Sequence, residues 1–237
     1  MTGLARYDAI AEFYPEFAPD VYDDPPMAAL LRFIGDIRSF QLLDLACGHG
    51  RLTRELARRD AHVIGVDISA ALLGVARMHE MKHPLHVSYI QADAASVALE
   101  GTMFDGITCS FGLSDIDDLE GAIATVARVL RPGGFFAFSI LHPCFPGWEA
   151  KQAASSWPPD RGYYAEGWWR PSSPAHGLRP RVGVNHRMLS SYLNAFARHQ
   201  LVMEQMAEPP PPSDWLSESP LGGPVPVYLV GRCRCIK

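Results

Sequence analysis

This sequence has few cysteines and no excess of positive charge, and each of these two features argues against a class of protein. There are five cysteines in 237 residues, and none of their spacings is that of a metal site. We therefore expect neither a disulfide-stapled domain nor a bound metal, and we interpret Cys233 and Cys235 as ordinary strand residues. The formal net charge is −5 and the basic residues are scattered. A nucleic-acid partner is therefore not expected.

Long apolar runs are absent too. No stretch reaches the ~18 consecutive apolar residues that a membrane-spanning helix needs. Residues 1–17 mix acidic and aromatic side chains and lack the apolar core of a signal peptide. We expect a cytoplasmic protein with no membrane partner, acting as a monomer or a homodimer. Because 48% of the residues are hydrophobic, the chain can still bury a large core.

The sequence does contain an alternation of short apolar strands and amphipathic helices. Strands are expected at residues 41–45, 62–66, 87–91, 106–111 and 135–141, with helices at 51–59, 70–79 and 119–130. A turn at 131–134 should separate the last helix from the last of these strands. Flanking elements are expected as helices in part of the N-terminal segment, at 28–37 and at 189–199, and as strands at 201–206 and 225–233. This alternation is typical of an α/β fold with a doubly wound, Rossmann-like parallel sheet.

Two neighbouring strand ends carry the residues of a ligand site. The first strand ends near Asp44, and Gly48 and Gly50 follow in the turn into the next helix, whose amides would face a ligand. The second strand ends at Asp67, where an acid accepts hydrogen bonds from ribose hydroxyls. A dinucleotide site is disfavoured, because Thr53 stands where the third glycine is required. An acid so close to a pyrophosphate would also repel it, whereas it suits a cationic ligand.

In these motifs the sequence resembles the class I S-adenosylmethionine-dependent methyltransferases. The segment 44–50 is similar to that family's first motif, with Ala46 where glycine is more usual. The resemblance continues through Asp67, residues 91–94, residues 104–112 and the turn at 130–134. It implies a seven-stranded sheet with the last strand antiparallel, and S-adenosyl-L-methionine as cofactor, with S-adenosyl-L-homocysteine as product. The cofactor-binding residues that it implies are Tyr14, Asp44, Ala46, Gly48, Gly50, Asp67, Ile68, Asp93, Ala94 and Phe111.

The alternation stops after Leu141, and an aromatic-rich insertion follows at 142–187. None of the five tryptophans occurs before residue 148. Such rings suit a lid over an aromatic or apolar small molecule, or serve as the insertion's own small core. The predicted substrate-binding residues are Trp148, Tyr163, Tyr164, Trp168 and Trp169. We expect one domain over 1–237, divided into a helical cap (1–38), a cofactor-binding core (39–141), this insertion and a C-terminal helix with strands (188–237).

A general base is required only if the acceptor must lose a proton before it is methylated. His142 is the first candidate, because it follows the fifth strand at the edge where the reacting atoms should lie. His186, where the insertion ends, is the second candidate and could equally cap a helix. Asp115 is a third, which we interpret instead as a cap of the following helix.

The sequence thus predicts a methyltransferase for an aromatic or apolar small molecule, acting on O, N or C. The whole pattern also resembles actinobacterial methyltransferases that tailor natural products. Alternatives are an enzyme that binds the same cofactor for another reaction, such as cyclisation, and a tRNA or protein methyltransferase. A nicotinamide-dependent oxidoreductase and a non-enzymatic binding module are more distant alternatives.

Overall fold

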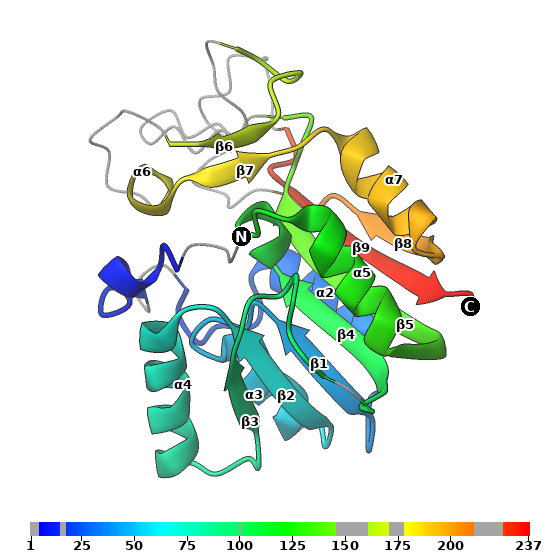
Figure 1. The fold of residues 1–237 in the computed structure, drawn as a ribbon. Helices are drawn as coiled ribbons and strands as arrows, with labels where there is room; N and C mark the ends of the chain where they lie inside the picture. The colour runs from blue at the N-terminus through cyan, green and yellow to red at the C-terminus, as the bar shows by residue number, and fades with distance from the viewer. Residues whose placement is uncertain (1–4, 15–17, 100, 146–160, 171–177, 211–224) are drawn as a thin grey trace.

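A computed structural model describes residues 5–14, 18–99, 101–145, 161–170, 178–210 and 225–237. Its main sheet has seven strands in the order β3-β2-β1-β4-β5-β9-β8 (Figure 1). The strands are β1 (Gln41–Leu45), β2 (His62–Asp67), β3 (Ser88–Gln91), β4 (Phe104–Ser110), β5 (Leu130–Leu141), β8 (Leu201–Ala207) and β9 (Tyr228–Cys235). Strands β1 to β5 are parallel, whereas β9 runs antiparallel to both β5 and β8. The predicted α/β fold with an antiparallel last strand is therefore confirmed.

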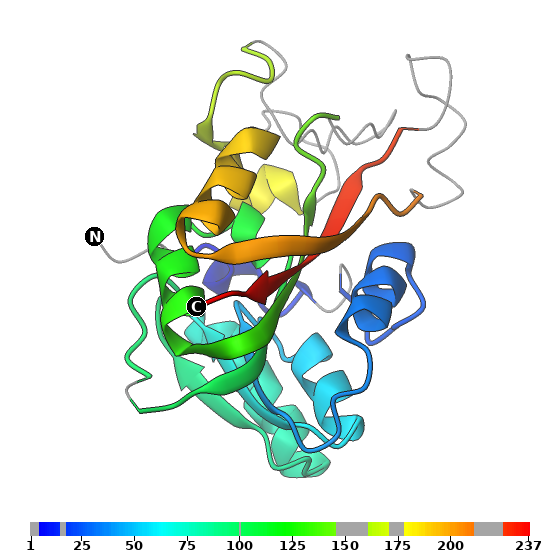
Figure 2. The ribbon, with the colours of Figure 1, turned by 90° about the vertical axis from the view of Figure 1, so that its right-hand side faces the viewer.

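Helices cover both faces of this sheet. They are α2 (Pro25–Ile34), α3 (Arg51–Arg58), α4 (Ala70–Lys82), α5 (Leu119–Val129) and α7 (Leu189–Arg198). Figure 2 shows α5 and α7 on one side of the sheet and α2 and α3 on the other. Since the central strands are covered on both sides, they can be apolar throughout, as parallel strands usually are.

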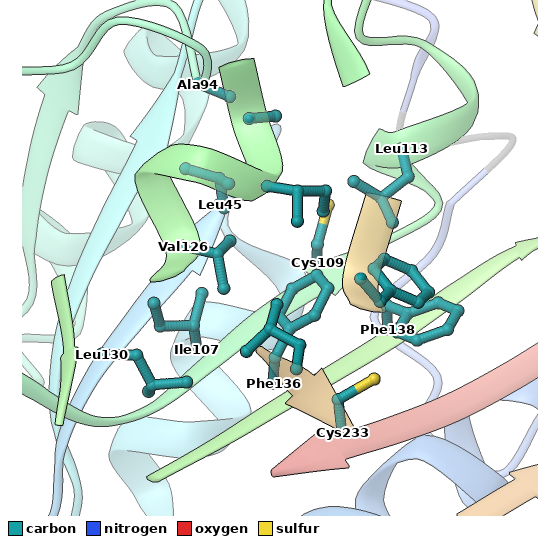
Figure 3. Packing of buried hydrophobic residues seen from close by; sticks show 14 of the residues in the cluster. Leu45, Ala94, Ile107, Cys109, Leu113, Val126, Leu130, Phe136, Phe138 and Cys233 are labelled. Atoms are coloured by element: carbon teal, nitrogen blue, oxygen red, sulfur yellow. The ribbon is translucent and has the colours of Figure 1, made fainter. Parts of the chain in front are cut away.

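Strand β5 shows how alternate side chains supply two cores. Phe136, Phe138 and Ile140 point toward α5 and α7, where they pack with residues of β1, β4 and β9 (Figure 3). Phe135 and Ala137 point to the opposite face, toward α2 and α3. This period of two is what a strand imposes on its side chains. The two cores fix the sheet, and with it the edge where β1, β2, β4 and β5 end.

Several sequence-based expectations for helices and strands differ from the structure. Helix α2 begins three residues earlier than expected, because Asp24 accepts a hydrogen bond from the Met27 amide (3.1 Å) and Pro25 starts the helix. The segment expected as a turn at 131–134 belongs to β5, where the register with β4 shifts and Gly133 takes a φ of 76°. In the described part of the N-terminal segment, regular helix is limited to the 3₁₀ turn η1 (Asp8–Ile10) and to Tyr14.

The insertion contains a small antiparallel hairpin of its own. Strand β6 (Gly167–Trp169) pairs with β7 (Val184–His186), and the short helix α6 (Arg179–Val182) precedes β7. Figure 1 shows the hairpin and α6 beyond the ends of β4 and β5. Trp148, Trp157 and Trp215 lie outside the described residues. Among those described, no helix has the length and apolarity to cross a bilayer, and no cluster of side chains has the make-up of a metal site.

Candidate functional site

The loop between β1 and α3 is built on left-handed backbone. Ala46, Gly48 and Gly50 have φ values of 55°, 58° and 81°. Glycine adopts this conformation without cost, and a Cβ on Gly50 would collide with the hydroxyl of Tyr89. Gly50 is also the N-cap of α3, so the loop leads into the amide end of a helix. The loop therefore presents backbone rather than side chains to a ligand, as the first motif predicts.

Asp67 joins this loop to the end of β2. Its carboxylate accepts hydrogen bonds from the Gly48 amide (2.7 Å) and the Ser69 amide (2.8 Å). The side chain is buried, and burial raises the pKa of its carboxyl to about 6. One bond to each oxygen leaves further lone pairs, which suit a diol. Asp67 therefore lies where the sequence places the ribose acid.

Asp44 is also close to the loop, but its carboxylate points into the protein. Its oxygens accept hydrogen bonds from the hydroxyls of Thr53 (2.6 Å) and Thr108 (2.7 Å), so it ties α3 to β4. It is only 1% exposed, and burial raises the pKa of its carboxyl to about 6. This geometry favours an indirect role, in which Asp44 fixes the loop. Direct contact with the cofactor stays a prediction.

Tyr14 lies over the glycine loop. One edge carbon of its ring is 3.8 Å from the position that a Cβ on Gly48 would take. The ring also packs edge-on against Tyr7 and His49, with centroids 5.3 Å apart in each pair. Burial raises the pKa of the Tyr14 phenol to about 12, so the hydroxyl stays protonated. The structure thus places Tyr14 next to the predicted cofactor site, with Tyr7 beside it, as the resemblance implies for at least one of the N-terminal tyrosines. It adds His49, which sequence reasoning missed.

The remaining predicted cofactor residues follow strands at the same edge. Ile68 comes after β2, and its carbonyl accepts a bond from the Gln91 side chain (3.4 Å). Asp93 follows β3 and accepts a bond from the Ala95 amide (2.9 Å), whereas the side chain of Ala94 packs in the core. Phe111 follows β4 in a left-handed conformation, and its amide donates to the Ser139 carbonyl (2.8 Å). For Ala94, this leaves only the backbone to face a ligand.

The two candidate bases are both buried and engaged. Nε2 of His142 lies 2.9 Å from Glu208, and Nδ1 accepts a hydrogen bond from the Cys144 amide (3.1 Å). Nε2 of His186 lies 2.6 Å from the Tyr163 carbonyl. Because Nδ1 of His142 is an acceptor, Nε2 carries the proton of the neutral ring. Glu208, which orients this histidine, was not apparent from sequence.

The predicted substrate residues have unequal surroundings. Tyr164 is 84% exposed and Trp168 is 45% exposed, with the Arg6 guanidinium 5.3 Å from the Trp168 ring centre. Trp169 is 9% exposed, and Tyr163 accepts a hydrogen bond at its hydroxyl from the Leu189 amide (3.0 Å). Some of these rings therefore support the insertion itself. Their contact with an acceptor stays a prediction, and that of Trp148 falls outside the described residues.

The interpretation of Asp115 as the cap of the following helix is wrong. The cap is Asp118, whose side chain accepts a hydrogen bond from the Gly121 amide (2.9 Å). Asp115 instead accepts bonds from the Tyr7 hydroxyl (2.7 Å) and from Arg179 (2.5 Å). We call this trio, Tyr7, Asp115 and Arg179, the junction. It joins the N-terminal segment, the loop after β4 and the insertion. Its members are far apart in sequence, so no local motif marks them.

Comparisons with known proteins agree with this geometry. Residues 43–138 match a family model described as a methyltransferase domain. A ubiquinone biosynthesis O-methyltransferase from Alkalilimnicola ehrlichii is 36% identical over 59% of this chain and 59% of its own length. A 2-phytyl-1,4-naphtoquinone methyltransferase from Thermosynechococcus vestitus is 36% identical over 57% of this chain and 58% of its own. This chain therefore aligns with less than two thirds of either relative.

Solved structures extend the likeness beyond the matched domain. An S-adenosylmethionine-dependent methyltransferase from Mesorhizobium loti is 27% identical, with a TM-score of 0.69 over 90% of this chain and 98% of that one. Another from Clostridium acetobutylicum has a TM-score of 0.66 over 96% and 98%, and at 16% identity it shows the fold alone. Residues 43–138 are thus similar to a methyltransferase domain, and the fold over 90% of this chain is similar to that of a solved S-adenosylmethionine-dependent methyltransferase.

Proposed function

We propose that this chain transfers a methyl group from S-adenosylmethionine to a small molecule. The observation that carries the proposal is the left-handed loop of Ala46, Gly48 and Gly50, bound to the buried carboxylate of Asp67. A backbone-lined loop beside an acid with free lone pairs fits an adenosine ribose and an amino-acid tail. The cofactor supplies an activated methyl group on a sulfonium, so the protein has mainly to align the acceptor and exclude water.

In this proposal, residues 39–141 bind the cofactor and residues 1–38 close over it. Asp67 holds the ribose, the Asp93–Ala94 segment holds the adenine, and Ile68 and Phe111 flank these groups. Tyr14 covers the loop, which its position beside Gly48 supports.

We assign the acceptor to residues 142–187. The aromatic side chains of this segment, Trp148, Tyr163, Tyr164, Trp168 and Trp169, suit an aromatic or apolar molecule. The ubiquinone and naphthoquinone names of the relatives support this class of acceptor. Methylation of tRNA or protein, and another reaction of the same cofactor, remain the alternatives. We further propose, as the most specific part of this assignment, that the chain tailors natural products as the actinobacterial methyltransferases that it resembles do.

We propose His142 as the base for acceptors that must lose a proton, with Glu208 holding its ring. For this role the Cys144 amide has to leave Nδ1, because that nitrogen carries the only lone pair of the neutral ring. The His142–Glu208 contact would then stabilise the charge that the ring acquires. His186 is the second candidate base. Its contact with the Tyr163 carbonyl favours a role in holding the insertion.

The test begins with calorimetric titration of S-adenosylmethionine, S-adenosylhomocysteine and NAD. Micromolar binding of the first two, with none of NAD, is the expected result. A screen with a labelled methyl group should then offer phenols, catechols, carboxylic acids and amines, with bulk tRNA and a protein mixture as the macromolecular alternatives. Binding of NAD alone would overturn the cofactor assignment. Tight cofactor binding with transfer only to tRNA or protein would overturn the small-molecule assignment.

A further inference from the structure

Arg179 is a buried cation that the proposed function does not use. It is 6% exposed, and it makes three hydrogen bonds with described residues, all through Nη1. The acceptors are Asp115 Oδ1 (2.5 Å), the Gly183 carbonyl (3.1 Å) and the Tyr7 hydroxyl (3.4 Å). Among the described residues, its Nε and Nη2 donate to no group.

The two uncommitted nitrogens form one edge of the planar guanidinium. Through Nε and Nη2, arginine can donate two parallel hydrogen bonds to the two oxygens of a carboxylate. The bonds made by Nη1 hold the guanidinium of Arg179 in one orientation, since their acceptors lie in the N-terminal segment, the loop after β4 and the insertion. The donor edge is therefore fixed before any ligand arrives, which lowers the entropy lost on binding.

The junction adjoins the cofactor site. Tyr7 packs against Tyr14, with ring centroids 5.3 Å apart, and Tyr14 lies over Gly48. The charges of Asp115 and Arg179 both act on the pKa of the Tyr14 phenol, and that of Asp115 also acts on Asp67. The arginine edge is thus near the place where cofactor and acceptor would meet.

Charge around Arg179 selects among anions. Asp115 neutralises the guanidinium before a ligand binds, and its carboxylate makes the surroundings of the guanidinium acidic. A doubly charged phosphate would meet this acidic surrounding at a higher electrostatic cost than a singly charged group. The planar donor edge also matches a planar carboxylate.

We propose that the Nε and Nη2 edge of Arg179 is a carboxylate-binding site at the junction. Two sources supply this chemistry: the amino-acid end of the cofactor, and an acidic group on the methyl acceptor. The inference rests on the proposed function, because both sources are ligands of that site. In either case Arg179 is a ligand-binding residue that sequence reasoning did not find.

Calorimetric titrations of Arg179→Gln and Arg179→Lys separate the two sources. The probes are S-adenosylhomocysteine, 5′-methylthioadenosine, and benzoate added to the complex of the protein with S-adenosylhomocysteine. Methylthioadenosine keeps the nucleoside and the sulfur but lacks the carboxylate. If the carboxylate belongs to the cofactor, S-adenosylhomocysteine should bind at least about tenfold more weakly, with methylthioadenosine unchanged. If it belongs to the acceptor, only benzoate affinity should fall.

Arg179→Lys guards against misfolding, because it keeps the cation beside Asp115 but lacks the planar edge. Arg198→Gln, which removes a surface partner of Glu120, is the matched control and should leave all three affinities unchanged. Equal loss of S-adenosylhomocysteine and methylthioadenosine would overturn the proposal, since it indicates a purely structural role. So would unchanged affinities in both folded variants. Failure of the wild-type protein to bind S-adenosylhomocysteine would instead contradict the proposed function.

Discussion

The glycine loop and the junction are built in different ways. The glycine loop, Asp67 and Ser69 lie close together in sequence, and backbone amides hold them in place. The junction joins Tyr7, Asp115 and Arg179 through side chains from three distant segments. The first arrangement depends on local backbone geometry and the second on tertiary packing. The comparison therefore separates the loop proposed to bind the cofactor from a contact that exists only in the folded chain.

The sharpest test of this separation is His142→Gln, for which we expect the largest effect. Loss of a general base should lower kcat about 10²- to 10⁴-fold with an acceptor found in the screen. Affinity for S-adenosylhomocysteine should not change, because we assign His142 to the acceptor. Transfer of labelled methyl and calorimetry measure the two quantities. His199→Gln, at a partly exposed histidine that also contacts a glutamate, is the control. A fall of less than about fivefold, with a lower Tm, would make His142 a structural residue of its turn.

Asp67→Ala tests the loop proposed to bind the cofactor. Removing the carboxylate should weaken S-adenosylmethionine binding by ~1–3 kcal/mol, because charge-assisted hydrogen bonds to the ribose are lost. Asp36→Ala, at an exposed carboxylate far from the loop, should bind like the wild type. Calorimetry with circular dichroism to verify folding is sufficient. Unchanged affinity for S-adenosylmethionine in a folded Asp67 variant would contradict the assignment of the ribose to Asp67.

The pH dependence of S-adenosylhomocysteine binding is a second test of the role of the Asp67 carboxylate. Burial raises the pKa of Asp67 to about 6, so below this pH the carboxyl of the free protein is protonated and accepts hydrogen bonds less well. Affinity for S-adenosylhomocysteine should therefore rise with pH between 5 and 7, by up to about tenfold per unit where the group titrates. Asp67→Asn should abolish this slope. Asp44 has a pKa raised to a similar value, so a slope that survives in Asp67→Asn and vanishes in Asp44→Asn would reassign the effect.

Ala46→Gly should have the smallest effect and the opposite sign. Ala46 has a φ of 55°, a conformation that costs an alanine ~1 kcal/mol relative to glycine. The variant should therefore unfold at a Tm about 1–4 °C higher. Ala57→Gly inside α3 is the control and should lower the Tm, because glycine destabilises a helix interior. A lower Tm for Ala46→Gly would show that the methyl group, which packs against Gly112, contributes more than the strain removes.

Sequence predicted the sheet and the glycine turn after its first strand because their signals are local. Alternating strands and helices, and glycines after a strand, reflect backbone conformations that neighbouring residues impose. The direction of the Asp44 carboxylate was less accessible, since it depends on Thr108 from a different strand. The role of Asp115 was misread because the nearer acid, Asp118, caps the helix, while its true partners are distant in sequence. Such long-range side-chain pairs leave no periodic trace.

On the proposed function, the junction also constrains how this chain could acquire a new acceptor. Residues 142–187 leave the core after β5 and return before α7, so the segment could in principle be exchanged without altering the seven-stranded sheet. Arg179, however, reaches back to Tyr7 and Asp115, which lie outside the segment. A chimaera that imports another insertion must therefore bring matching residues at positions 7 and 115. A change of acceptor in this chain is thus expected to need coupled changes at three places rather than replacement of one loop.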